Sequence, residues 1–205
     1  MKRFFVVLVL MFSFQASCDG LITNEIVENS VQKYGPQSKK RFMSIYKNLI
    51  VKLKNASEIK KINTVNTWFN YIQYVSDKQL YKTNDYWATI YEFVGRGAGD
   101  CEDYTIAKYY TLKELGVDPK KMKFTYVIYQ DSRGRKIPHM VLAYFLVPKP
   151  KSKQDILILD NTNRQVLPAS KRPDIIKVLK MINGDTGAKS KKWKMLEKNM
   201  REKKL

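Results

Sequence analysis

Hydrophobic positions in the first half of the chain follow the period of an α-helix. Ile62, Val65, Phe69 and Ile72 lie three or four residues apart, which predicts a helix that packs one face on a core. Between residues 101 and 115 apolar side chains occur on nearly every side of the helical wheel. This second helix is therefore expected to run through the core.

Both ends of the second predicted helix carry end signals. Asp100 is a favourable N-cap, and Asp103, three residues later, is placed to cap the first turn. Gly116 is a natural C-cap, and Pro119 prevents the helix from continuing. Cys101 is therefore expected at the first position of a buried helix.

After residue 120 the pattern changes to runs of β-branched and aromatic residues. Strands are predicted for residues 123–130, 139–147 and 155–160, separated by the turn-forming segments DSRGRKIP and PKPKSKQ. Strands that follow one another with short connections are typical of an antiparallel sheet. Together with the helices, they predict an α+β fold in which the helix of Cys101 packs on this sheet.

The first 18 residues have the composition of a secretion signal. Lys2 and Arg3 precede an apolar run, residues 4–14, that is too short to span a membrane, and small residues follow it. Cleavage is expected after Cys18. The alternative is a lipoprotein site with Cys18 lipidated, which Gln15 disfavours. No later stretch is long and apolar enough to cross a bilayer, so we expect an exported protein.

Length and charge indicate that the rest of the chain consists of one globular core and a basic tail. With 205 residues and 44% hydrophobic content, the chain can bury one substantial core, which we place at residues 19–185. Residues 186–205 are strongly basic, and a solvated helix or a disordered extension is expected there. The formal net charge of +19 favours acidic partners or an anionic membrane surface, and export argues against nucleic acid.

Cys101 is a candidate reactive thiol. Because Cys18 is either removed or lipidated, Cys101 has no partner for an internal disulfide in an exported chain. A buried cysteine that acts as a small hydrophobic residue is the alternative. The position at a helix N-terminus favours the reactive thiol, since free backbone N–H groups there stabilise a thiolate and a developing oxyanion.

His139 and Asp160 complete a candidate catalytic set. His139 is the only histidine of the chain and opens the second predicted strand, whereas Asp160 closes the third. Taken singly, a lone histidine is more often a surface or core residue, and an aspartate at a strand end more often shapes a turn. Together with Cys101 they provide the nucleophile, base and orienting carboxylate of covalent acyl chemistry.

The segment DYWATIYEFVGRGAGDCEDYTIAKYYTLKELGV, followed by HMVLAYF and ILDN, resembles the bacterial transglutaminase-like cysteine proteinases, the LapG family of periplasmic proteases. The similarity extends over about residues 63–185, and GAGDCED is its most specific part. It implies a papain/transglutaminase-like fold, with Cys101 as nucleophile, His139 as general base and Asp160 as its orienting residue.

The resemblance also implies a substrate and partners. Members of the family cleave the N-terminal region of very large surface adhesins, which releases the adhesin and detaches biofilm cells. Many are held inactive by the periplasmic domain of an inner-membrane receptor that senses cyclic di-GMP. They need calcium, and the motif assigns Asp100 and Glu102 to the ion.

A bound calcium ion would explain how Cys101 could form a thiolate despite the acidic residues around it. Asp100, Glu102 and Asp103 surround Cys101, and three carboxylates oppose formation of a thiolate. Oxygen ligands suit Ca²⁺, and a bound cation would offset most of their negative field. For Asp103 we favour simple helix capping. Two or three carboxylates do not fill six to eight coordination positions, so further ligands are expected.

Three classes of function follow. The first is a calcium-dependent cysteine endopeptidase of the periplasm. The second is an acyltransferase or amidase on the same fold, which would pass the acyl group to an amine or act on cell-envelope peptides. The third is a binding module without catalysis, which the presence of all three candidate residues disfavours.

Overall fold

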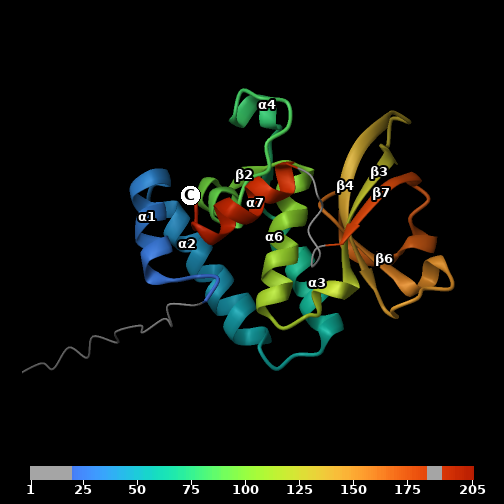
Figure 1. The fold of residues 1–205 in the computed structure, drawn as a ribbon, viewed down its shortest axis with the longest axis horizontal. Helices are drawn as coiled ribbons and strands as arrows, with labels where there is room; N and C mark the ends of the chain where they lie inside the picture. Colours follow the sequence, from blue (N-terminus) through green and yellow to red (C-terminus); the bar gives the residue numbers. More distant parts are fainter. Residues whose placement is uncertain (1–19, 184–190) are drawn as a thin grey trace, which may run out of the picture.

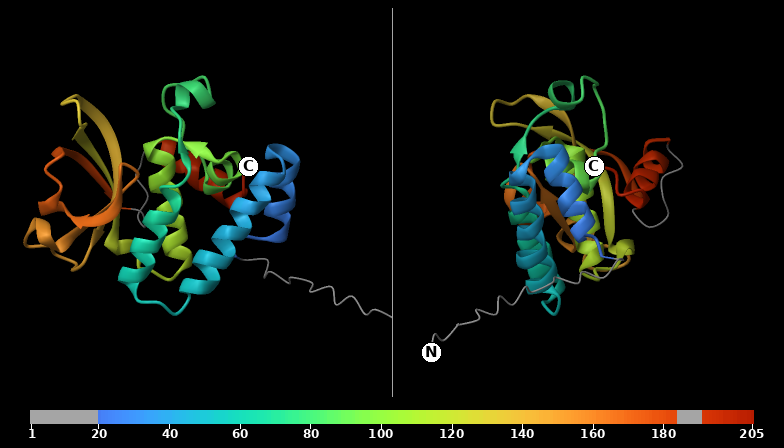
Figure 2. Two further views of the ribbon diagram at one scale, coloured as in Figure 1. Left: turned by 180° about the vertical axis from the view of Figure 1, so that it is seen from behind. Right: turned by 90° about the vertical axis from the view of Figure 1, so that its left-hand side faces the viewer.

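The computed structural model describes residues 20–183 and 191–205. A helical half and a curved sheet lie on opposite sides of one long helix, α6 (Cys101–Glu114). Front and rear views show the same order, with helices on one side and strands on the other (Figures 1 and 2). The predicted α+β class is confirmed. The predicted secretion signal and the boundary at residue 185 fall outside the described residues.

The helical half is formed mainly by the segments before α6. Its helices are α1 (Asn24–Tyr34), α2 (Pro36–Ile45), the π-helical turn Tyr46–Val51, α3 (Glu58–Phe69), α4 (Asp77–Leu80) and α5 (Ile90–Arg96). Two short strands, β1 (Gln73–Tyr74) and β2 (Ala98–Gly99), pair in parallel just before the cysteine. The predicted helix with Ile62, Val65 and Phe69 on its buried face is α3, and Ile72 lies beyond its end.

The five-stranded sheet has the order β6–β5–β4–β3–β7, and all of its neighbours are antiparallel. The strands are β3 (Met122–Gln130), β4 (Lys136–Phe145), β5 (Ile156–Asp160), β6 (Asn163–Pro168) and β7 (Ile175–Asn183). The three strands predicted from the sequence are β3, β4 and β5. The two edge strands were not predicted, because their side chains are mostly exposed or half-buried and lack a clear alternation.

Helix α6 forms where its end signals predict. The side chains of Asp100 and Asp103 form a reciprocal capping box at its start, and Gly116, with a φ of 80°, follows its last residues in the left-handed region. The helix packs against α3 and α5 on one side and against β4 on the other. Its interior position explains why apolar residues occur all round it.

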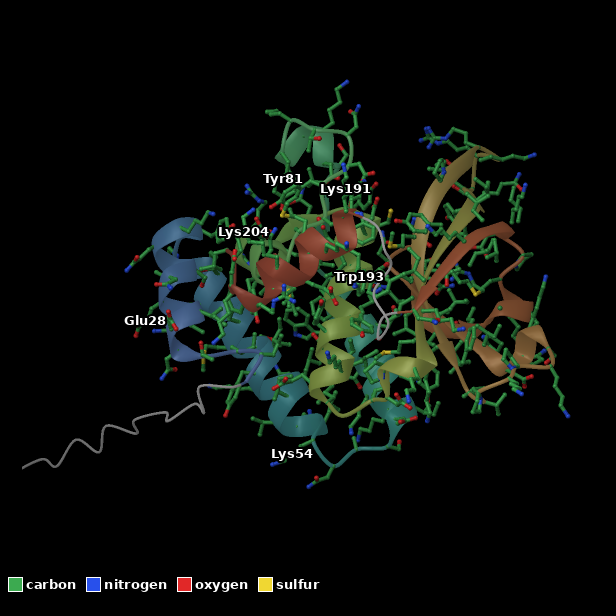
Figure 3. All side chains as sticks on the ribbon, in the orientation of Figure 1. Glu28, Lys54, Tyr81, Lys191, Trp193 and Lys204 are labelled. Atoms are coloured by element: carbon green, nitrogen blue, oxygen red, sulfur yellow. The ribbon has the colours of Figure 1, made fainter. Side chains whose placement is uncertain are left out.

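The C-terminal helix α7 (Lys191–Arg201) corrects one expectation. Trp193 is 1% exposed and lies between α7 and α6, with its ring 5.0 Å from that of Phe124 and 6.4 Å from that of Tyr109 (Figure 3). Leu196 and Met200 are buried beside it. The prediction of a solvated or disordered tail is therefore wrong for residues 191–205. Apolar residues three or four positions apart anchor this helix within a basic segment.

Candidate active site

Cys101 begins α6 and lies against strand β4. The hydroxyl of Thr105, one turn later, donates to the Cys101 carbonyl at 2.8 Å and to the Met140 carbonyl at 3.3 Å. These two contacts tie the first turn of the helix to the strand residue that follows His139. The partly buried thiol is thereby held next to the part of β4 that carries His139.

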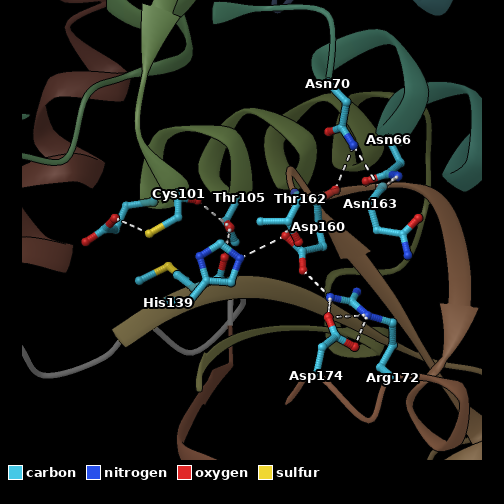
Figure 4. Close-up of polar contacts among 12 residues, drawn as sticks. Asn66, Asn70, Cys101, Thr105, His139, Asp160, Thr162, Asn163, Arg172 and Asp174 are labelled. Atoms are coloured by element: carbon cyan, nitrogen blue, oxygen red, sulfur yellow. Dashed lines mark hydrogen bonds and ion pairs between the residues drawn. The ribbon is translucent and has the colours of Figure 1, made fainter. Parts of the chain in front are cut away.

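His139 lies between Cys101 and Asp160. Its Nε2 atom is 2.8 Å from Asp160 Oδ1, and both side chains are buried. Figure 4 shows the other ring nitrogen facing the sulfur of Cys101. The structure thus brings together the three residues that the sequence proposed, from a helix start, strand β4 and the end of strand β5. Nε2–H donating to the carboxylate leaves Nδ1 to accept a proton from the thiol.

Asp160 is held by donors from several elements. Besides His139, its Oδ1 accepts the backbone N–H of Thr162 at 2.9 Å, and its Oδ2 lies 2.6 Å from Nη2 of Arg172 (Figure 4). Asn70, just beyond α3, donates to the Asp160 backbone carbonyl at 2.7 Å. Burial alone raises the pKa of Asp160, but the contacts with His139 and Arg172 outweigh it and lower that pKa. The carboxylate is thus kept ionised.

The thiol of Cys101 is surrounded by negative charge. Its Sγ donates to Glu102 Oε2 at 2.8 Å. Burial, followed by the charge and the hydrogen bond of Glu102, raises the pKa of Cys101 well above its ordinary value. Burial and the charges of Glu102 and Asp103 likewise raise the pKa of Asp100 to about 9. The repulsion expected from the sequence is therefore present in the fold.

A second acidic group lies beside this one. The carboxylates of Asp77, Asp100 and Asp103 are buried and lie within 4.8 Å of one another. Asp103 accepts the backbone N–H groups of Ala88 and Asp100, which supports the capping role favoured for it. In contrast, Oδ1 of Asp77 and Oδ1 of Asp100 are buried without a hydrogen-bond partner among the described atoms. Buried, unpaired carboxylate oxygens at this spacing fit a hard cation such as Ca²⁺.

A model of the bacterial transglutaminase-like cysteine proteinases matches residues 38–201. The chain belongs to this family. Solved structures agree: LapG of Legionella pneumophila is 34% identical with a TM-score of 0.69, and the alignment covers 88% of this chain and 97% of LapG. The calcium-bound form of that LapG is 33% identical over 88% of this chain and 99% of LapG, with a TM-score of 0.68.

An EGTA-treated form of the same LapG matches equally well, with 31% identity and a TM-score of 0.68. No curated protein matches the chain by sequence. The family resemblance recognised in GAGDCED and in the strands that follow is therefore confirmed, and with it the transglutaminase-like fold. Among the described residues, no helix has the length and apolar content needed to cross a membrane.

Three residues of this candidate site were not predicted from the sequence. Asp77 reaches the acidic group from α4, Arg172 reaches Asp160 from the segment between β6 and β7, and Asn70 reaches it from the end of α3. An aspartate at a helix start, an arginine before a proline and an asparagine after a helix are ordinary capping and turn residues. No local signal separates them from such residues.

Proposed function

We propose that this proteinase is a calcium-dependent cysteine endopeptidase of the periplasm that cleaves the N-terminal region of a large surface adhesin. Cleavage would release the adhesin and promote biofilm detachment. One observation carries the proposal: His139, hydrogen-bonded to the buried Asp160, faces Cys101 in a chain similar to LapG. In this proposal Cys101 is the nucleophile, His139 the base and Asp160 the residue that orients it.

The first half of the reaction forms a thioester. Nδ1 of His139 takes the proton of the Cys101 thiol, while Asp160 stabilises the imidazolium and holds its tautomer. The thiolate attacks the carbonyl carbon of the scissile peptide bond and forms a tetrahedral intermediate. The C–N bond then breaks as His139 gives its proton to the departing amine. The N-terminal fragment stays attached to the sulfur.

The second half restores the enzyme. His139 removes a proton from a water molecule, the hydroxide adds to the thioester carbonyl, and the C–S bond breaks. The thiolate leaves and is protonated again by His139. In both halves the oxyanion forms near the amino end of α6, where the helix dipole and the first-turn N–H groups favour negative charge.

Calcium has a candidate site next to the nucleophile. Asp100 and Glu102 would hold the ion, and the unpaired oxygen of Asp77 supports it as a further ligand. Bound there, Ca²⁺ would supply positive charge against the carboxylates that raise the pKa of Cys101. Engaging Glu102 would also free the thiol from its present acceptor, so that His139 could accept the proton.

Location and partners rest on the resemblance and on charge. The predicted signal in residues 1–18 directs export, which leads to the periplasm. A strongly positive chain suits an acidic repeat adhesin, an acidic face on the periplasmic domain of a cyclic di-GMP receptor, or peripheral contact with an anionic membrane. The receptor domain is proposed as an inhibitor that holds the enzyme inactive.

The test is cleavage of the N-terminal segment of a large repeat adhesin from the same cell by the purified mature protein. Calcium should support cleavage, EGTA should stop it, and added calcium should restore it. Cys101→Ala is the inactive control. Mass spectrometry separates the chemistries: new peptide termini mean hydrolysis, whereas an amine adduct or an isopeptide crosslink means acyl transfer. Unchanged cleavage after thorough chelation would reject the calcium requirement.

A further inference from the structure

We propose that Arg172 is a positioning residue of the catalytic centre, which acts through Asp160, and that Asp174 holds Arg172 in place. The proposal rests on the cysteine-peptidase function put forward above and adds two residues behind Cys101, His139 and Asp160, the buried Arg172 and the partly exposed Asp174. In Figure 4 dashed lines run from His139 to Asp160, from Asp160 to Arg172 and from Arg172 to Asp174, while Cys101 lies on the other side of His139.

Arg172 is in close contact with two carboxylates, the buried one of Asp160 and the partly exposed one of Asp174. Its side chain is 1% exposed, and Nη2 lies 2.6 Å from Oδ2 of Asp160 and 2.6 Å from Oδ2 of Asp174. Its Nε atom lies 2.9 Å from Oδ1 of Asp174. Asp174 therefore binds one edge of the guanidinium at two nitrogens and fixes the direction in which Nη2 points. A planar fork held at two nitrogens has little freedom to turn.

The two oxygens of Asp160 have different partners, which makes the arginine contact decisive. Oδ1 is shared by His139 Nε2 and the Thr162 N–H group, whereas Oδ2 is bonded only to Arg172 among the described residues. With both oxygens bonded, the plane of the carboxylate is set. Without Arg172, Oδ2 would be buried and unpaired, so the carboxylate would turn or take up a proton. Either change would misplace the imidazole.

Lys108 also interacts with the charge of Asp160, but it does not replace Arg172. Its Nζ is fully buried on α6 and has no hydrogen-bond partner among the described atoms. It lies 5.7 Å from the centroid of the Tyr104 ring. Lys108 can therefore contribute charge at a distance, but of these two cations only Arg172 is hydrogen-bonded to the carboxylate.

A double-mutant cycle tests whether Arg172 acts through Asp160. The mature protein with saturating calcium is compared as wild type, Arg172→Met, Asp160→Asn and the double variant. We expect Arg172→Met to lower kcat by about 10- to 100-fold, by analogy with outer-shell residues that orient metal ligands, with KM unchanged. In the Asp160→Asn background the same change should alter kcat less than about twofold, because the group that it positions is already disabled.

Further variants keep the test decisive if Arg172→Met folds poorly. Asp174→Asn leaves the arginine in place but loosens it, so kcat should fall by a smaller factor that also disappears in the Asp160→Asn background. Arg172→Lys should recover part of the rate. Arg164→Met is the matched control, because this exposed arginine stacks on Tyr71 and should leave kcat unchanged.

The outcomes separate this proposal from the proposed function. An equal loss of kcat from Arg172→Met in both backgrounds, or no loss in either, would overturn the positioning role. The rate at which iodoacetamide alkylates Cys101 is measured in the same four proteins and should show the same non-additive pattern. If the wild type cleaves no adhesin segment, the proposed substrate is wrong, while the alkylation cycle still decides the role of Arg172.

Discussion

Replacing Trp193 by alanine should remove the main anchor of α7 and lower the free energy of unfolding by about 3–5 kcal/mol, the usual cost of truncating a buried aromatic residue to alanine. Trp193 is 1% exposed and packs on Phe124, Tyr109 and Trp87, with ring centroids 5.0, 6.4 and 6.4 Å away. For a chain of this length, 1 kcal/mol shifts Tm by about 2–4 °C. The expected fall in Tm is therefore roughly 6–20 °C.

The matched control lies on the same helix. Met195 is 57% exposed, so Met195→Ala should change the stability by less than about 0.5 kcal/mol, as is usual at exposed sites. Both variants are compared by thermal and urea unfolding of the mature protein, followed by circular dichroism. If Trp193→Ala and Met195→Ala unfold at the same temperature as the wild type, α7 does not contribute to the core, and the packing argument fails.

The same substitution should also affect α6, the helix that begins at Cys101. Trp193 packs edge-on against Trp87, and the next residue, Ala88, donates its N–H to Asp103 at 2.8 Å, which caps the first turn of α6. Loosening α7 therefore loosens the cap beside Cys101. We expect Trp193→Ala, assayed well below its Tm, to lower kcat more than Met195→Ala does.

Three further predictions concern single buried side chains. Asp160→Asn should fold, because Arg172 keeps its contacts with Asp174, but should lose about 10⁴-fold in kcat by analogy with the serine triad; a rate near that of the wild type would show that another group orients His139. Asp77→Asn should reduce the rise in Tm that calcium causes and raise the calcium concentration needed for cleavage; an unchanged calcium response would remove Asp77 from the ligand set. Lys108→Met should stabilise the protein at pH 7 by up to about 4 kcal/mol, since burial lowers the pKa of the amine to about 7 against about 10.4 in the unfolded chain. Between about pH 7 and pH 10 the unfolded wild type binds more protons than the folded wild type, so the wild type gains stability as the pH rises and the extra stability of the variant should shrink. Urea unfolding at pH 7 and pH 10 measures this difference in the free energy of unfolding. An equal difference at both pH values would show that the amine of Lys108 does not have the lowered pKa.

The sequence by itself determined the elements whose signals are local. Helix α6 begins and ends at its predicted caps because Asp100, Asp103 and Gly116 act on backbone groups within one turn. The three inner strands were predicted because buried strands are rich in β-branched and aromatic residues. The candidate residues Cys101 and His139 stood out because each is the only residue of its type in the predicted mature chain.

Tertiary structure alone decided the remaining features. Arg172 meets Asp160 because strands β5 and β6 and the turn after them return the chain to the same place, and Asp77 meets Asp100 across 23 positions of sequence. The basic segment around Trp193 resembled a solvated tail because its charges outnumber its apolar residues, yet three apolar side chains on one face, Trp193, Leu196 and Met200, anchor the helix on the core. Caps and periodicity depend on neighbours within a few residues, whereas these contacts depend on how distant segments pack, which a single sequence does not show without its fold.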